Sequence, residues 1–154
     1  MHSWGAWDAS WSWSLVLIAV TLTIHVTGIG GISNAIERLR TTLMRSRQYV
    51  GSTPTTIVAI VLVALALALL HGIESITWAV AYVHLGAFAS PSDAVLYSVD
   101  SMTTRGSSGL EPVREWRMMG ATEAGDGMLL FGISTAFLFY VMTRLWKTAY
   151  SSRT

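Results

Sequence analysis

The residues with the most distinctive chemistry form one short polar segment between long apolar stretches. They are Thr103, Thr104, Arg105, Gly106, Ser107, Ser108 and Gly109. Glycine and small hydroxyl residues suit irregular backbone, and the guanidinium group of Arg105 carries a permanent positive charge. Irregular backbone at membrane depth is tolerated only where protein buries it or where it lines a water-filled cavity. We therefore expect the chemistry of this segment to concern ions.

Four carboxylates are candidates to pair with Arg105. Asp100 lies five residues before it. At about 1.5 Å of rise per residue, Glu123 and Asp126 stand about 27 to 32 Å before Arg144, and Glu74 stands about 25 Å after Ile57. We therefore expect all four carboxylates to converge on Arg105 and to support the polar segment as ion pairs. One alternative stays open here: Glu123 and Asp126 cap or solvate a helix end.

Composition places these groups in a membrane protein. Of 154 residues, 52% are hydrophobic and 12% are charged, against about 25% charged residues in soluble domains. A formal net charge of +1 offers no basic surplus for nucleic acid, so no nucleic-acid partner is expected. The chain has no cysteine and therefore forms no disulfide. We expect an all-α membrane protein whose partner is the lipid bilayer.

Three long apolar segments are expected to cross the membrane. The first runs from about residue 14 to 32, the second begins after Pro54, and the third ends near Met142. Each is long enough for about 30 Å of hydrocarbon. Residues 1–54 then comprise a Trp-rich N-terminus, the first span and a basic loop, and residues 55–154 hold the other two spans and the polar segment.

Basic residues predict the orientation of these spans. Residues 37–47 contain four arginines against one glutamate, and Arg144, Lys147 and Arg153 follow the third span. By the positive-inside tendency both regions are cytoplasmic, which puts the N-terminus outside and the C-terminus inside the cytoplasmic membrane. No small-residue cleavage site follows the first apolar stretch, so we expect no cleaved signal peptide.

A short helix is predicted just before the polar segment. Ser90 is a good N-cap, Pro91 suits the first helical position, and Asp93 completes a capping-box spacing. The run to Met102 gives a helix of about 18 Å, roughly half the hydrocarbon thickness. Such a helix between two spans indicates re-entry into the membrane from the outer side. Its carbonyl end would then direct partial negative charge toward the midplane, which favours a cation.

The order of these features resembles the pore domain of the potassium-channel superfamily. The similarity covers about residues 56–146 and rests on three runs: residues 96–112, Trp116-Arg117 and residues 127–132. It implies an outer helix over 55–84, a pore helix over 91–103, a selectivity filter over 103–109 and an inner helix over 117–147. It also implies a homotetramer around one central pore, with permeant ions in place of any cofactor.

The filter departs from the potassium-selective pattern of that superfamily. The family sequence is Thr-Val-Gly-Tyr-Gly or a near variant, whose backbone carbonyls replace the hydration shell of the ion. Here Arg105 replaces the aliphatic residue and Ser107 the aromatic one. We expect a weakly selective channel for monovalent cations. An anion-permeable pore, if Arg105 faces the lumen, and a non-conducting scaffold or modulatory subunit are the alternatives.

The resemblance also suggests a hinge and a gate on the inner helix. The residues concerned are Gly127, Phe131, Gly132 and Phe139. In the family a glycine near this position allows the helix to bend, and bulky residues close the pore by dewetting. An alternative stays open here as well, because glycines in membrane helices commonly permit close packing and aromatic residues commonly face lipid.

No enzyme chemistry is expected. The scattered histidines show no metal-binding spacing, and no nucleophile, base and orienting group can be assembled from the sequence. His25 is the one ionisable residue within the first span, and we expect it to hydrogen-bond a backbone carbonyl or a neighbouring helix without a function of its own. The sequence therefore predicts neither a catalytic residue nor a metal site.

Overall fold

The computed structural model describes residues 4–45, 53–106 and 109–151, and every regular element in this part of the chain is helical. The elements are α1 (Trp4–Arg45), α2 (Thr53–His84), α3 (Pro91–Met102), the short 3-10 helix η1 (Arg114–Trp116) and α4 (Arg117–Ser151). The prediction of three long helices and one short helix is confirmed. The bounds of α2 and α3 differ from the predicted ones by no more than two residues.

Three helical stretches are long and apolar enough to cross a membrane. They are Ala9–Leu39, Pro54–His84 and Arg114–Lys147. Since an α-helix needs about 20 predominantly apolar residues to span the hydrocarbon, these lengths indicate a multi-pass membrane protein.

The basic stretch after the first span differs from the prediction of a loop. Helix α1 continues through it as far as Arg45, while residues 46 and 47 lie outside the described part of the chain. Arginine, leucine, methionine and glutamate favour helix, and no glycine or proline interrupts residues 37–45. Polarity alone therefore did not end the helix.

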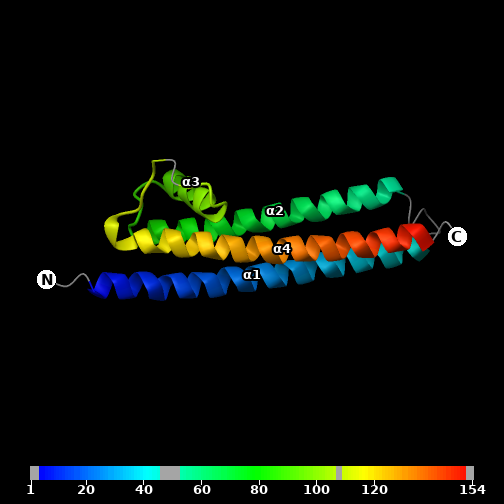
Figure 1. Ribbon diagram of the computed structural model, residues 1–154, viewed down its shortest axis with the longest axis horizontal. Helices are drawn as coiled ribbons and strands as arrows, with labels where there is room; N and C mark the ends of the chain where they lie inside the picture. Colours follow the sequence, from blue (N-terminus) through cyan, green and yellow to red (C-terminus); the bar gives the residue numbers. More distant parts are fainter. Residues whose placement is uncertain (1–3, 46–52, 107–108, 152–154) are drawn as a thin grey trace. The chain divides into compact units, whose positions relative to one another are not determined.

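The chain folds as two compact units, and each long helix contributes to both. The first unit contains Met1–His25 and His71–Phe131, and the second contains Val26–Leu70 and Gly132–Thr154. Figure 1 follows the helices in chain order.

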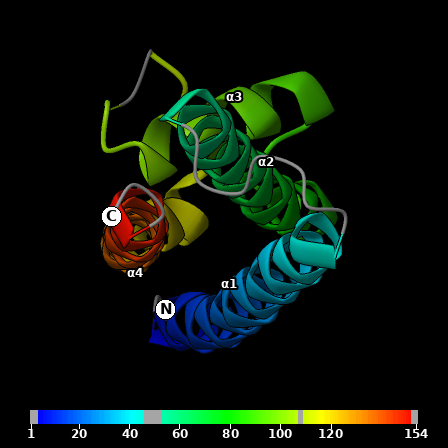
Figure 2. The same cartoon turned by 90° about the vertical axis from the view of Figure 1, so that its right-hand side faces the viewer.

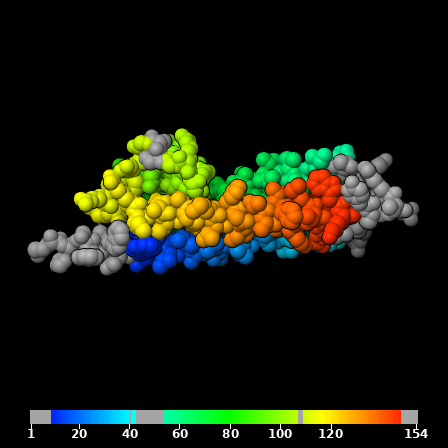
Figure 3. Space-filling model, viewed as in Figure 1, coloured from blue at the N-terminus to red at the C-terminus, as the bar shows by residue number. Residues whose placement is uncertain are grey.

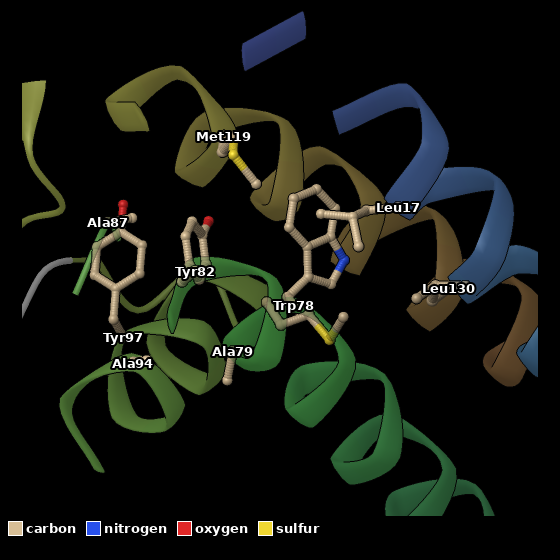
Figure 4. Close-up of a cluster of buried hydrophobic side chains, with 10 residues drawn as sticks. Leu17, Trp78, Ala79, Tyr82, Ala87, Ala94, Tyr97, Met119 and Leu130 are labelled. Carbon is tan, nitrogen blue, oxygen red and sulfur yellow. The ribbon is translucent and has the colours of Figure 1, made fainter. Parts of the chain in front are cut away.

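The first unit is built around an aromatic core on α2. Trp78 and Tyr82 are fully buried, and Figure 4 shows their side chains extending from α2 toward Met119 on α4. Leu17 of α1 belongs to the same cluster. The rings of Tyr82 and Tyr97 of α3 meet edge to face, with centroids 5.5 Å apart, an arrangement that aromatic pairs prefer. The core thus joins all four helices of this unit.

The second unit has a separate aliphatic core. Val63 and Leu67 of α2 pack with Val141 of α4, and isoleucines of α1 cover them. Gly28 lets α1 approach α2 closely, because a Cβ atom at this position would lie 2.8 Å from the Leu70 side chain. Aliphatic side chains need no polar partners, so the second unit is held together by apolar packing.

Helix α3 begins as the capping pattern predicts. Ser90 has an extended backbone, its Oγ accepts a hydrogen bond from the Asp93 amide at 3.4 Å, and Pro91 takes the first helical position. Figures 1 and 2 show α3 on the side of α2 and α4 that lies away from α1. The cap therefore fixes where the chain turns back from the end of α2.

Candidate functional site

Helix α3 runs back along α2 from the end where α2 stops. The Ser98 hydroxyl lies 2.7 Å from the Ser75 carbonyl oxygen, and the Ser75 hydroxyl lies 3.2 Å from the Met102 sulfur. Ser75 comes nine residues before His84, the last residue of α2. At 1.5 Å per residue, the carboxyl end of α3 therefore lies about 14 Å back from the end of α2.

Gly127 places the same end of α3 against α4. A Cβ atom built on Gly127 would collide with the Met102 backbone carbonyl, so a side chain at this position would displace one of the two backbones. Gly127 comes ten residues after Arg117, the first residue of α4. The carboxyl end of α3 is thus also about 15 Å from the start of α4, in agreement with the estimate along α2.

A Schellman motif ends α3. The Arg105 amide donates to the Asp100 carbonyl at 3.0 Å, and the Thr104 amide donates to the Ser101 carbonyl at 2.9 Å. In this motif the residue after the cap takes a left-handed conformation and is usually glycine. Here that residue is Thr104, with φ of 55°. The first turn of the predicted filter therefore stores a backbone strain on the order of 1 kcal/mol.

Arg105 folds back onto α3. Its Nη1 atom lies 3.1 Å from Oδ1 of Asp100, which is buried, whereas 67% of the arginine side chain is exposed. Its backbone amide also bonds to Asp100, as described above. Arg105 thus contacts Asp100 twice, through an ion pair with its carboxylate and a hydrogen bond to its carbonyl.

Glu123 lies deep between α2, α3 and α4. The Tyr82 hydroxyl donates to its Oε2 at 2.8 Å, and the Ser98 hydroxyl contacts its Oε1 closely. Because the Ser98 hydroxyl has one proton, it donates either to Glu123 or to the Ser75 carbonyl at any moment. Glu123 is fully buried, so it does not solvate the end of α4.

Asp126 joins α4 to α1 and α2. Its Oδ2 accepts hydrogen bonds from the Thr21 hydroxyl at 2.6 Å and from the Trp78 indole at 3.2 Å. Like Glu123, this carboxylate is buried and does not cap the helix end.

The expectation that four carboxylates converge on Arg105 differs from the structure. Asp100 does pair with it, but Glu123 and Asp126 bond to hydroxyl and indole groups. Glu74 meets His25 instead, with 2.7 Å between Nδ1 and Oε1. Counting residues gives the height of an acid along a helix, but its direction around the helix axis decides its partner.

The predicted filter lies at the surface of the single chain. Thr103, Thr104, Gly106 and Gly109 are exposed, as is Arg105, while Ser107 and Ser108 lie outside the described residues. Figure 3 shows the yellow-green segment after α3 at the molecular surface, beside the beginning of α4. Gly106 and Gly109 have φ of 87° and 91°, a region that glycine enters without steric cost.

The predicted hinge and gate residues have different surroundings. The backbone of α3 occupies the space that a side chain at Gly127 would need, which supports a role in close packing. A Cβ atom at Gly132 would have no neighbour within 4 Å. Phe131 and Phe139 are each 68% exposed in the single chain. Their surfaces are therefore available to lipid or to another subunit.

The sequence analysis missed one cluster, formed by His25, His71 and Glu74. His71 and Glu74 are three residues apart on α2, and this spacing was the available signal because it puts two side chains on one helix face. His25 comes from a different helix, α1, so no spacing along the sequence indicated that it would join them. The prediction that His25 bonds to a neighbouring helix is confirmed by its contact with Glu74.

Comparison with known proteins gives no family for this chain: no protein-family model, no curated protein and no solved structure matches it.

We expect Gly127→Ala to destabilise the protein by about 2 kcal/mol, because overpacking a tight backbone contact typically costs 1 to 3 kcal/mol. The matched control is Gly125→Ala, since a Cβ atom there would have no neighbour within 4 Å. Thermal unfolding of the two purified variants in detergent tests this. Equal melting temperatures would contradict the close approach of α3 and α4.

We expect Glu123→Ala to lower stability by about 2 kcal/mol, because it leaves the buried Tyr82 hydroxyl without its acceptor. The control is Glu115→Ala, which removes an exposed carboxylate from η1. Chemical unfolding monitored by tryptophan fluorescence compares the two variants. A Glu123→Ala protein as stable as the Glu115→Ala protein would show that this network does not hold the unit together.

Proposed function

We propose that the chain is one subunit of a homotetrameric pore-loop ion channel in which residues 103–109 line the narrowest part of a central pore. The proposal includes the orientation predicted from the basic residues, with the N-terminus outside and the C-terminus inside. It assigns α2 as the outer helix, α3 as the re-entrant pore helix and α4 as the inner helix.

The depth reached by α3 carries this proposal. Its carboxyl end contacts Ser75 on α2 and approaches Gly127 on α4, about 14 to 15 Å from the neighbouring helix ends. That distance is about half of a 30 Å hydrocarbon layer. A loop that returns from such a depth exposes backbone polar groups, which need shelter in protein or water. A pore along the axis of an oligomer supplies both.

The chemistry at the end of α3 favours cations. The carbonyl end of a helix carries a partial negative charge, and α3 directs that end toward the exposed segment around Gly106. The pairing of Arg105 with Asp100 offsets the positive charge that would otherwise oppose a cation there. This arrangement supports a pore lined by backbone and hydroxyl groups, with Arg105 behind it.

An uncovered apolar face on α3 supports assembly. Val95, Leu96 and Val99 lie on one side of the helix and are 38% to 45% exposed in the single chain. The opposite side, with Ala94 and Ser98, is buried within the unit. Burial of these apolar side chains is favourable, and in the proposed tetramer the adjacent subunit buries them.

A second candidate function is an anion-permeable pore. Its supporting observation is that 67% of the Arg105 side chain remains exposed. Four such side chains directed at the axis would form a cationic ring, which selects anions. The ion pair with Asp100 favours the cation channel over this alternative, and ion fluxes distinguish the two.

We expect the full chain, reconstituted in liposomes, to pass K⁺ and Na⁺ at rates that differ by less than about tenfold, because its filter lacks the potassium-selective pattern. Chloride flux should be much smaller. The measurement is ion flux under imposed K⁺, Na⁺ and Cl⁻ gradients. Absence of flux for every ion would overturn the channel proposal, and a reversal potential that follows chloride would favour the anion pore.

A backbone variant provides the matched control for flux. Gly106→Val should reduce conduction strongly, since a β-branched residue does not readily adopt φ of 87°. Gly30→Val, in α1, changes a helical glycine with no Cβ neighbour within 4 Å and should leave flux near the wild-type value. If both variants conduct equally, the filter lies elsewhere.

We expect Arg105→Leu to lower the melting temperature of the assembled protein by about 2 to 4 °C, because it removes the cation beside buried Asp100. The double variant Arg105→Leu with Asp100→Asn should recover most of that loss, because it also removes the buried negative charge that the single variant leaves unpaired. Unchanged stability together with raised cation flux would instead place Arg105 in the lumen.

A further inference from the structure

His25, His71 and Glu74 form a polar cluster that the proposed channel does not use. His25 comes from α1, and the other two come from α2. Each side chain offers one ligand atom, and these atoms all lie within 4.8 Å of one another. Histidine and glutamate are metal-binding side chains, so their convergence from two helices calls for a chemical explanation.

The geometry of the cluster is compact. Nδ1 of His25 lies 2.7 Å from Oε1 of Glu74, and Nδ1 of His71 lies 3.2 Å from Oε2. The two imidazole rings are 5.2 Å apart between centroids and tilted by 46°. Each oxygen of the carboxylate thus faces the Nδ1 atom of one imidazole ring.

We propose that these three side chains bind a divalent first-row transition-metal ion of the zinc class. Two histidines and one glutamate are a known donor set for zinc, with a fourth position left for water or another ligand. With ligand bonds of 2.0 to 2.1 Å, the donor atoms of a tetrahedral site are about 3.3 Å apart. The contacts of 2.7 and 3.2 Å and the limit of 4.8 Å require only small side-chain movements to reach that spacing.

Burial of the carboxylate argues for a cation here. Glu74 and His25 are fully buried, and Glu74 lies ten residues before the end of α2, about 15 Å along the helix. Glu74 Oε2 accepts no hydrogen bond in the described part of the chain, although His71 Nδ1 approaches it without hydrogen-bond alignment. A carboxylate in a membrane span requires a partner charge, and a bound metal ion supplies it.

The donor set also selects the class of metal. Imidazole suits zinc, copper, iron and nickel, whereas magnesium and calcium prefer an all-oxygen environment. The His71 side chain is 27% exposed, so one of the three donors lies at the surface of the chain. A metal bound here ties α1 to α2 within the first unit, whether or not the assembled protein conducts ions.

The experiment measures Zn²⁺ binding to the full chain, purified in detergent without a polyhistidine tag and stripped of metal with a chelator. Isothermal titration should give one Zn²⁺ per chain, and Co²⁺ should give visible absorption bands of a four-coordinate site. Zn²⁺ should also raise the melting temperature. His71→Ala and Glu74→Gln should each weaken binding at least about 100-fold. Loss of a residue that only supports a metal ligand typically costs up to about 100-fold, and loss of a ligand itself should cost more.

His84→Ala is the matched control, because His84 is an exposed histidine at the end of the same helix. It should bind Zn²⁺ as the wild type does. The variants are compared at a temperature where circular dichroism shows that all remain helical, so that misfolding is not mistaken for lost binding. No stoichiometric Zn²⁺ binding by the wild type, or equal binding by His71→Ala and wild type, would overturn the proposal.

Discussion

Ionisable side chains buried in apolar helices must find their partners inside the protein, and the first unit is organised by this constraint. Glu123, Asp126 and Glu74 are all buried, and each meets a donor from another helix. Water cannot supply these contacts at membrane depth. The helices are therefore held in register by specific pairs, whereas the second unit needs only its aliphatic core.

The close approach at Gly127 makes these pairs possible. Because Gly127 puts no side chain on that face of α4, the carboxyl end of α3 packs directly against α4. Ser98 of α3 then contacts Glu123 of α4. A larger residue would separate α3 from α4 and withdraw that hydroxyl from the carboxylate. The glycine that resembles a hinge by its position in the sequence thus has a packing role that the local geometry explains.

The sequence predicted what depends on local signals. Hydropathy located the long helices, and Ser90 with Pro91 located the start of α3, because cap and backbone preferences act within one turn. It predicted the pairing of Asp100 with Arg105 but not the partners of Glu74, Glu123 and Asp126. Counting residues gives height along a helix, but each residue also turns the side chain by about 100° around the axis. Tertiary packing decides which face of α1 meets which face of α2, and the contact between His25 and Glu74 depends on it.

The turn after α3 connects these packing constraints to the proposed pore. Thr104 takes the left-handed position of the Schellman motif. The next residue, Arg105, then donates a hydrogen bond from its amide to Asp100 and forms an ion pair with the Asp100 carboxylate. Because Asp100 is buried against the unit, it provides a fixed point for both bonds. Swinging Arg105 toward a lumen would break the ion pair and leave a buried carboxylate without that cation. The helix end and the ion pair therefore stabilise the same conformation, in which Arg105 is turned back toward α3.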